Sequence, residues 1–242
     1  MPEPVADQPR PDAPARPSWK TLLEHPAVPY VGPFAVFLLI LSVQSYLGAL
    51  GEWQAPLWFV VLGLVIFALS RRVLDLSMAA PAASVAVGIA VFAVWIAPDL
   101  LWPAMREHWL FQNRLVGSAP HPANAALSTS SVFLIFRFLR AVVIVPVAEE
   151  LFWRGWLMRW LIAADFKSVP LGAYTPRAFW FSAILFAVEH GSYWDVGLAA
   201  GIAYNLWVMR TKRLGDCILA HAVTNATLSA YVIWTGQWRY WP

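Results

Sequence analysis

The stretch Val142-Val-Ile-Val-Pro-Val-Ala-Glu-Glu-Leu-Phe-Trp-Arg-Gly-Trp-Leu-Met-Arg159 places two adjacent carboxylates inside an apolar run. Arg154 follows Glu150 by four residues, and positions i and i+4 share one face of a helix, so these two side chains can pair. Glu149 is rotated by about 100° from its neighbour and points elsewhere. The stretch therefore predicts a helix in which one carboxylate is neutralised and a second is held beside it. A solvated helix end at a membrane surface would carry the same local pattern.

The composition is that of a membrane protein. Hydrophobic residues make up 60% of the chain and charged residues 13%, whereas soluble domains average about 45–50% apolar and about 25% charged residues. The net charge is +3 and no basic run contains interleaved aromatic residues, so a nucleic-acid partner is not expected. Cys217 is the only cysteine, which excludes an intrachain disulfide.

Apolar segments follow one another along most of the chain. Residues 1–27 form a proline-rich tail that we expect to be disordered, and residues 28–242 form a single membrane domain whose motif-bearing core covers about 128–236. The expected helices cover residues 28–50, 55–70, 79–96, 130–162, 177–190, 196–209 and 217–234, with an interfacial helix within residues 99–128. Because a spanning helix needs about 20 apolar residues, the pattern predicts an all-α, polytopic membrane helix bundle of about seven to eight transmembrane helices.

Prolines and glycines add local expectations. The third helix is expected to end at Pro98. Residues 130–162 would form about 50 Å of helix, too long for one perpendicular crossing, so this segment is expected to bend or break near Pro146. Gly197 and Gly201 share one helix face, which allows a neighbouring helix to pack closely.

Basic residues in the short loops predict an orientation in the bilayer. Arg71-Arg72, Arg154 with Arg159 and Lys167, and the basic residues of 210–213 would all be cytoplasmic together with the N-terminal tail. The C-terminus would then lie on the opposite side.

Two histidines and an asparagine interrupt apolar helices. His190 ends one such segment, and His221 shares a helix face with Asn225, four residues later. Any one of these side chains alone can form a hydrogen bond that links two helices. Together with Glu149 they supply a base, proton carriers and an amide donor, which are the groups needed for attack of water on a peptide carbonyl.

The ordered motifs resemble a known family. Glu149-Glu150-Leu-Phe-Trp-Arg154, Phe186-x-x-x-His190 and His221-x-x-x-Asn225 resemble the CAAX-prenyl-protease and bacteriocin-processing family of intramembrane proteases. The motifs span roughly the C-terminal half of the chain. The segment from Ser229 to Trp238 also looks like a bacterial subgroup associated with exosortase-type protein sorting.

The resemblance implies a cavity within the membrane and a role for each motif residue. Glu149 would activate water with help from His190, Glu150 and Arg154 would set the charge and orientation of Glu149, and His221 and Asn225 would stabilise the oxyanion. It also implies an endopeptidase that cuts near the C-terminus of a membrane-associated or lipidated protein or peptide. Such a protein would be multi-pass in the bacterial inner membrane, with the lipid bilayer around it.

Zinc is an alternative use of the same residues. Glu149, His190 and His221 could complete a catalytic zinc site with a water in the fourth position. The His-Glu-x-x-His helix of many zinc proteases is absent, because Glu189-His190-Gly-Ser-Tyr does not fit it. We therefore expect a metal-independent mechanism that needs no cofactor.

Two other function classes use the same features. A non-catalytic membrane scaffold or self-immunity protein could bind a partner through the same cavity, although it would not need Glu149, His190 and His221 together. A proton-coupled transporter could relay protons through acids and histidines, but the chain shows no internal repeat of the kind many transporters carry. No sequence feature points to a substrate-binding residue or to an oligomeric state.

Overall fold

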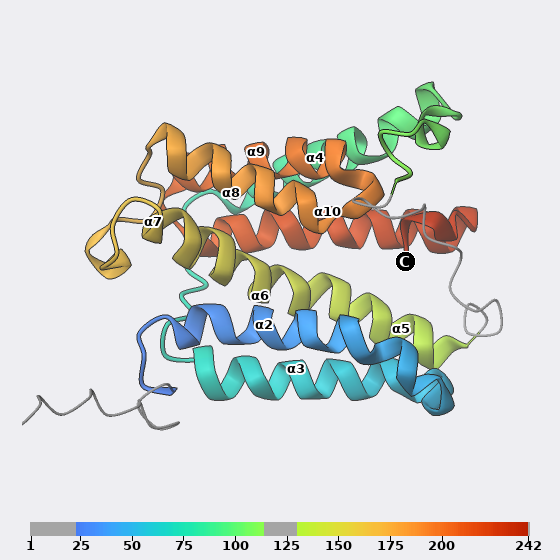
Figure 1. Ribbon diagram of the computed structural model, residues 1–242, viewed down its shortest axis with the longest axis horizontal. Coiled ribbons are helices and arrows are strands. Elements are labelled where there is room, and N and C mark those ends of the chain that lie inside the picture. Colours follow the sequence, from blue (N-terminus) through green and yellow to red (C-terminus); the bar gives the residue numbers. More distant parts are fainter. Residues whose placement is uncertain (1–22, 114–129, 242) are drawn as a thin grey trace, which may run out of the picture.

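A computed structural model describes residues 23–113 and 130–241, and within these ranges it is all-helical, without strands (Figure 1). Most of the expected N-terminal tail, residues 1–22, lies outside the described part, as does the second half, residues 114–128, of the segment expected to hold an interfacial helix. In the first half of that segment, α4 runs to Leu101 and a short 3₁₀ turn, Met105–Glu107, follows. The α-helices, in chain order, are α2 (Val28–Val43), α3 (Gln54–Ser70), α4 (Pro81–Leu101), α5 (Ser131–Leu139), α6 (Val145–Glu150), α7 (Met158–Trp160), α8 (Pro176–Glu189), α9 (Trp194–Thr211) and α10 (Leu214–Thr235).

A single long helix is central to the bundle. π-helical turns at Arg140–Ile144 and Leu151–Leu157 join α5, α6 and α7 into one uninterrupted helix over residues 131–160. Figure 1 shows this helix between the α2–α3 pair on one side and α4, α8, α9 and α10 on the other. The adjacent glutamates therefore lie in the middle of the bundle, between helices that pack on both sides of the long helix.

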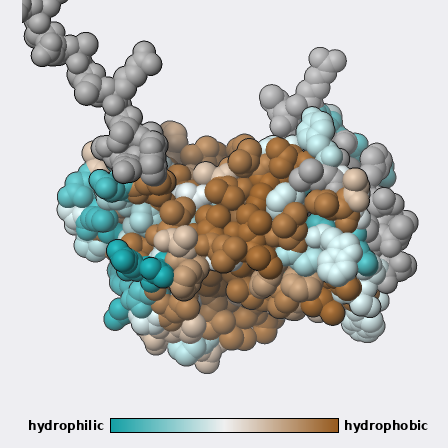
Figure 2. Space-filling model, turned by 90° about the horizontal axis from the view of Figure 1, so that it is seen from below, coloured by the Kyte–Doolittle hydropathy of each residue, from teal (hydrophilic) through white to brown (hydrophobic). Residues whose placement is uncertain are grey.

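The surface is that of an integral membrane protein. Among the described residues, four helices are long and apolar enough to cross a bilayer: Gly48–Ser70, Pro81–Leu101, Ser131–Trp160 and Leu214–Thr235. Large apolar side chains such as Leu39, Leu64 and Val188 remain more than 60% exposed. Figure 2 shows hydrophobic side chains covering the middle of one face, with hydrophilic groups toward its two ends. The expectation of seven to eight crossings remains a prediction, because α2 and α8, at 16 and 14 residues, are shorter than a full span.

The helix ends fall into two groups. The start of α2, the α3–α4 connection, the α7–α8 connection and the α9–α10 turn lie at one end of the bundle, whereas the C-terminus lies at the other (Figure 1). Arg71, Arg72 and Lys167 belong to the first end and are exposed. Arg154 does not: the expectation that it lies in a cytoplasmic loop is wrong, because its side chain is buried within the long helix and paired there.

The expected helix end at Pro98 is wrong, and so is a break at Pro146, where the segment instead has π-helical turns on both sides. Helix α4 continues through Pro98 to Leu101, since Pro98 lies in the last turn and its carbonyl still accepts a hydrogen bond from the Trp102 amide. The long helix continues through Pro146 without a break. The preceding π-helical turn widens the backbone ahead of Pro146 and so relieves the clash that proline causes in a regular helix.

Small residues set the closest helix contacts. A Cβ added at Gly201 would lie 3.1 Å from the Ala183 carbonyl oxygen, and one added at Gly197 would lie 3.1 Å from Cβ of His190. The expected close packing at these two glycines is therefore present, and it brings α9 against α8. Gly88 plays the same part between α4 and α10, where a Cβ would come within 2.4 Å of the Ala220 carbonyl oxygen.

Candidate active site

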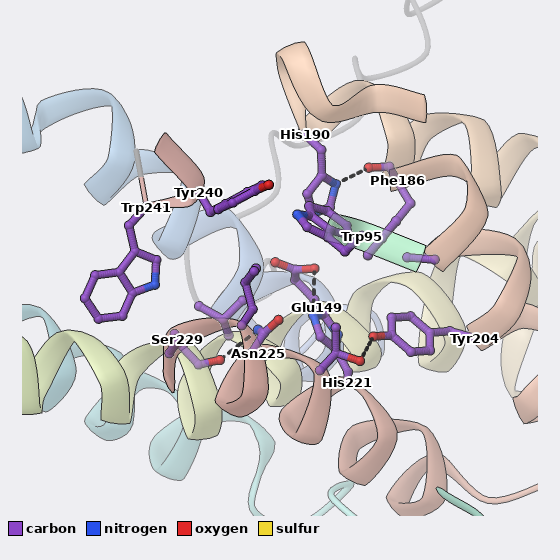
Figure 3. A pocket seen from close by; sticks show the side chains of 15 residues that line it. Trp95, Glu149, Phe186, His190, Tyr204, His221, Asn225, Ser229, Tyr240 and Trp241 are labelled. Carbon is purple, nitrogen blue, oxygen red and sulfur yellow. Dashed lines mark hydrogen bonds and ion pairs between the residues drawn. The ribbon is translucent and has the colours of Figure 1, made fainter. Parts of the chain in front are cut away.

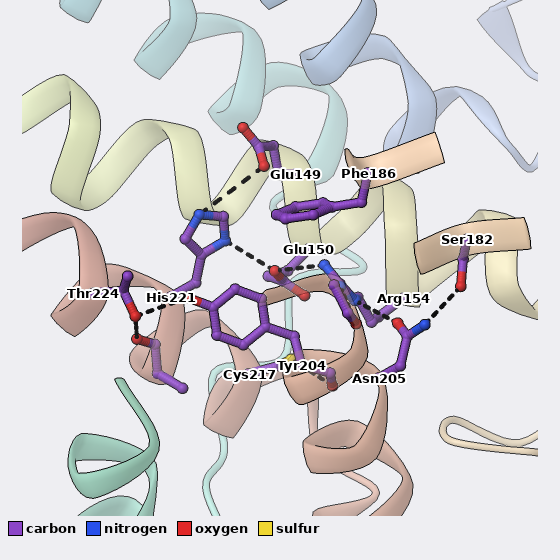
Figure 4. A network of polar contacts seen from close by, with 12 residues as sticks. Glu149, Glu150, Arg154, Ser182, Phe186, Tyr204, Asn205, Cys217, His221 and Thr224 are labelled. Carbon is purple, nitrogen blue, oxygen red and sulfur yellow. Dashed lines mark hydrogen bonds and ion pairs between the residues drawn. The ribbon is translucent and has the colours of Figure 1, made fainter. Parts of the chain in front are cut away.

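Glu150 is the ion-paired member of the two adjacent glutamates, although its Oε2 has no hydrogen-bond partner within the described residues. Its Oε1 accepts hydrogen bonds from Arg154 Nη1 at 3.0 Å and from His221 Nδ1 at 2.9 Å (Figure 4). The Glu150 and Arg154 side chains are both inaccessible to solvent. The expected i, i+4 pair therefore exists, and His221 from α10 completes it. A buried carboxylate with a cation and a second donor on one oxygen is suited to hold a fixed position.

Arg154 is held by residues that the sequence analysis did not identify. Its Nε donates to Asn205 Oδ1 at 3.0 Å and its Nη2 donates to the Gly201 carbonyl at 3.1 Å. Asn205 Nδ2 in turn donates to the Phe179 carbonyl and to Ser182 Oγ, each at 2.9 Å. Asn205 lies four residues after Gly201 on the same face of an apolar helix, which is the signal that could have revealed it.

Glu149 lies on the cavity side of α6. The residue is 4% exposed. Its Oε2 lies 4.0 Å from His221 Nε2 (Figure 4) and has no hydrogen-bond partner within the described residues. His221 thus stands between the two carboxylates, with one ring nitrogen toward each. The pattern of one neutralised and one available glutamate, expected from the sequence, is present in the structure.

His190 reaches the same cavity from the C-terminal end of α8. Its Nδ1 lies 2.7 Å from the Phe186 carbonyl (Figure 3). Because a carbonyl oxygen only accepts, Nδ1 carries the proton and Nε2 of the neutral ring is left as an acceptor. The Phe186 and Trp95 rings pack against the imidazole at centroid distances of 4.7 and 5.1 Å. These contacts orient His190 and leave Nε2 to exchange protons.

Pro146 accounts for the position of Asn225. In the π-helical turn the Val145 amide donates to the Arg140 carbonyl, so it does not serve the carbonyl of Ala141. The next amide position is Pro146, which has no N–H. The Ala141 carbonyl is therefore free to accept from Asn225 Nδ2 at 2.8 Å. One amide hydrogen of Asn225 is used in this contact, and the second is left for another acceptor.

These side chains surround a cavity of about 180 Å³ (Figure 3). Glu149, His190, His221 and Asn225 line it together. A second cavity of about 270 Å³ shares Glu149 and His190 with the first. Tyr204 stacks on the His221 ring at a centroid distance of 5.0 Å, and its hydroxyl donates a hydrogen bond to Thr224 Oγ1 at 2.8 Å. These two contacts hold the side of the cavity that Tyr204 and His221 form. The six residues predicted for the site are thus within one buried network and its adjoining cavity.

Glu189 is a second carboxylate at this cavity that the sequence analysis did not select. It lines the larger cavity, and its Oε2 is buried without a hydrogen-bond partner in the described part of the chain. Its position directly before His190, at the end of an apolar segment, was the available signal.

The residues named for a zinc site are arranged differently from a metal-ligand set. Within residues 23–113 and 130–241, no three His, Cys, Asp or Glu side chains form a group that could hold a metal ion.

The arrangement can perform base catalysis on a bound carbonyl. It combines a carboxylate whose Oε2 has no hydrogen-bond partner within the described residues, a histidine with an available ring nitrogen, and an amide hydrogen, all facing one cavity. Such groups can take a proton from water, return it to a leaving amine and bind a developing oxyanion.

Comparison with known proteins agrees with this chemistry. The family model described as type II CAAX prenyl endopeptidase Rce1-like matches residues 131–227. The matched segment contains all six residues predicted for the site. No match was found among curated proteins or among solved structures. The match supports a relationship of residues 131–227 to the CAAX-type prenyl endopeptidase family, and that family implies a protease.

Proposed function

We propose that this protein is an intramembrane endopeptidase in which Glu149 activates the attacking water. The proposed substrate is a membrane-associated or lipidated protein or peptide, cut near its C-terminus. The observation that carries the proposal is the contrast between two adjacent glutamates. Glu150 Oε1 accepts hydrogen bonds from Arg154 and His221 and Glu150 lines neither cavity, whereas Glu149 lines both cavities and its Oε2 has no hydrogen-bond partner within the described residues.

Each surrounding residue has a proposed role. Glu149 takes the proton from water, and this proton passes by way of His190 Nε2 to the leaving amine. The Glu150–Arg154 pair positions Glu149 through their shared helix. His221 and the second amide hydrogen of Asn225 stabilise the oxyanion of the tetrahedral intermediate. Donors held in place by other hydrogen bonds need little reorganisation during reaction, which favours such stabilisation.

We also propose that the reaction is independent of metal. Support comes from the side-chain positions: within residues 23–113 and 130–241, no three His, Cys, Asp or Glu side chains form a group that could hold a metal ion. The test is elemental analysis of the purified protein, with cleavage assayed in a strong chelator. Retained activity is expected. Activity lost in chelator and restored by zinc would assign Glu149, His190 and His221 to a metal site instead.

The cellular setting is proposed from the loop charges and the resemblance. The protein would lie in a bacterial inner membrane with its N-terminus cytoplasmic. The link of residues 229–238 to exosortase-type sorting stays a prediction, since the family match ends at residue 227.

The decisive cellular test compares the C-termini of membrane proteins by mass spectrometry. Three strains express, at matched levels, the wild-type protein, the Glu149→Gln variant or the Glu107→Gln variant. Glu107→Gln is the control, because the Glu107 side chain is exposed and does not line the cavity. The proposal expects an extended form of at least one membrane protein to accumulate with Glu149→Gln only. Identical profiles in all three strains, combined with a phenotype on gene deletion, would favour the non-catalytic scaffold.

A further inference from the structure

The larger cavity has a cationic end. Arg137 and Arg140 line it from the start of the long helix, whereas Glu149, Glu189 and His190 line it farther along. The Arg137 guanidinium lies 5.0 Å from the centre of the Trp241 ring. The cavity therefore runs from two arginines to the proposed catalytic glutamate, so its two ends carry opposite charge.

Arg140 is a cavity-lining cation without a hydrogen-bond or ion-pair partner among residues 23–113 and 130–241. Arg154 and Arg106 are both paired with carboxylates. No carboxylate or other hydrogen-bond acceptor within residues 23–113 and 130–241 pairs with Arg140, which is half-buried. An arginine near a helix end can extend its side chain to the membrane surface. Arg140 instead lines the cavity that also holds Glu149.

We propose that Arg140, assisted by the charge of Arg137, binds a carboxylate of the substrate. This inference rests on the proposed endopeptidase function and adds a specificity-determining residue to it. Guanidinium groups bind carboxylates through paired hydrogen bonds, and a partly desolvated pair is stronger than one in water. Glu149 and Glu189 at the other end repel an anion, so a substrate with one carboxylate is bound in a single direction.

The length of the cavity predicts where the cut falls. Nine residues of helix separate Arg140 from Glu149, which corresponds to about 13 Å at about 1.5 Å per residue. Their side chains lean in the same direction along the helix, so this separation is kept at the side-chain ends. An extended peptide covers about 3.3–3.6 Å per residue. The carboxylate therefore lies about four residues beyond the bond that is cut.

The test measures binding without turnover. Full-length Glu149→Gln protein in lipid nanodiscs is titrated with fluorescent apolar nonapeptides made as free C-terminal acids and as C-terminal amides. A third set carries the amide and one Asp in the last four positions. Charge-assisted hydrogen bonds predict that acids bind about 10- to 100-fold more tightly than amides. Adding Arg140→Gln should remove this difference, whereas Arg140→Lys should retain part of it.

Controls separate the possible failures. Arg177→Gln removes an exposed arginine at the start of α8, outside this cavity, and should leave the acid preference unchanged. Amide peptides with Asp that bind as tightly as the acids would identify a side chain, rather than the terminus, as the bound carboxylate. Equal binding of all three sets, or no binding, would overturn the proposal. Cleavage of the same peptides by the wild-type protein tests the endopeptidase function separately.

Discussion

Glu149 and Glu150 share one helix turn but have different surroundings, because a helix rotates successive side chains by about 100°. Glu150 pairs with Arg154 on its own helix and with His221 of α10. Glu149 points into the cavity. The spacing of Glu150 and Arg154 could predict their pair, because both residues lie on one helix. The Asn205 and Ser182 contacts that hold Arg154 could not be predicted, since they depend on how separate helices pack.

Removing one member of the buried pair should destabilise the protein strongly. Arg154→Gln leaves Glu150 buried beside a neutral group, and breaking such a pair typically costs about 3–5 kcal/mol of the free energy of unfolding. The double variant Glu150→Gln/Arg154→Gln removes both charges and should recover about half of this loss or more. Chemical unfolding of the detergent-solubilised protein measures both effects, with the exposed Arg177→Gln as control. Equal stability of all variants would contradict a buried ion pair.

At the scale of elements, the long helix differs most from expectation. Pro146 in an apolar segment predicts a break, yet the chain adopts π-helical turns and continues. The reason lies in the tertiary structure. Helices α2, α3 and α10 pack along both sides of this segment, and Asn225 donates a hydrogen bond to the free Ala141 carbonyl. Proline spacing alone contains no information on that partner, so the error could not be avoided from the sequence.

Replacing Pro146 should alter the site without weakening the fold. Pro146→Ala restores an amide N–H that can donate to the Ala141 carbonyl and compete with Asn225. We expect cleavage to fall by about tenfold or more, because a fixed oxyanion donor is typically worth about 10²–10³ in rate. The unfolding temperature should be unchanged or higher. Pro98→Ala, at the end of α4, is the matched control; a similar loss of activity there would exclude a specific role for Pro146.

The contact between α8 and α9 should be sensitive to the size of the side chain at position 201. At Gly201 a new side chain meets backbone atoms of Ala183 at 3.1–3.2 Å, and the Gly201 carbonyl also holds Arg154. Gly201→Val should therefore cost about 1–3 kcal/mol of stability through overpacking. Gly63→Ala is the control, because its Cβ would make an ordinary 3.8 Å contact with Ile144. A lower free energy of unfolding for Gly63→Ala than for Gly201→Val would contradict this packing.

At the scale of the whole molecule, composition predicted the membrane bundle because apolar helices of this length have few other stable environments. The bundle places the loop with Arg71 and Arg72 at one end and the C-terminal end of α10 at the other (Figure 1). The number of crossings was harder to predict. A short helix such as α8 has apolar residues that pack inside the bundle as well as apolar residues on its surface, so its hydrophobicity alone does not show whether it crosses the bilayer.

Labelling of single cysteines tests the orientation. Cys217 is buried, so Cys217→Ala provides a background for Arg72→Cys and Thr235→Cys, both at exposed positions. In intact cells, with the outer membrane permeabilised, a maleimide that does not cross the inner membrane should label Thr235→Cys only. In inverted membrane vesicles it should label Arg72→Cys only. The reverse pattern would invert the orientation, and labelling of both from one side would contradict the bundle.

The central claim is that the two adjacent glutamates have separate functions, and paired substitution tests it most directly. Purified Glu149→Gln and Glu150→Gln proteins are compared with wild type for cleavage of the same substrate and for unfolding. Glu149→Gln should abolish cleavage while keeping wild-type stability, because Glu149 Oε2 makes no hydrogen bond within the described residues. Glu150→Gln should lower stability, because Arg154 and His221 lose their shared acceptor. An active Glu149→Gln protein would contradict the account.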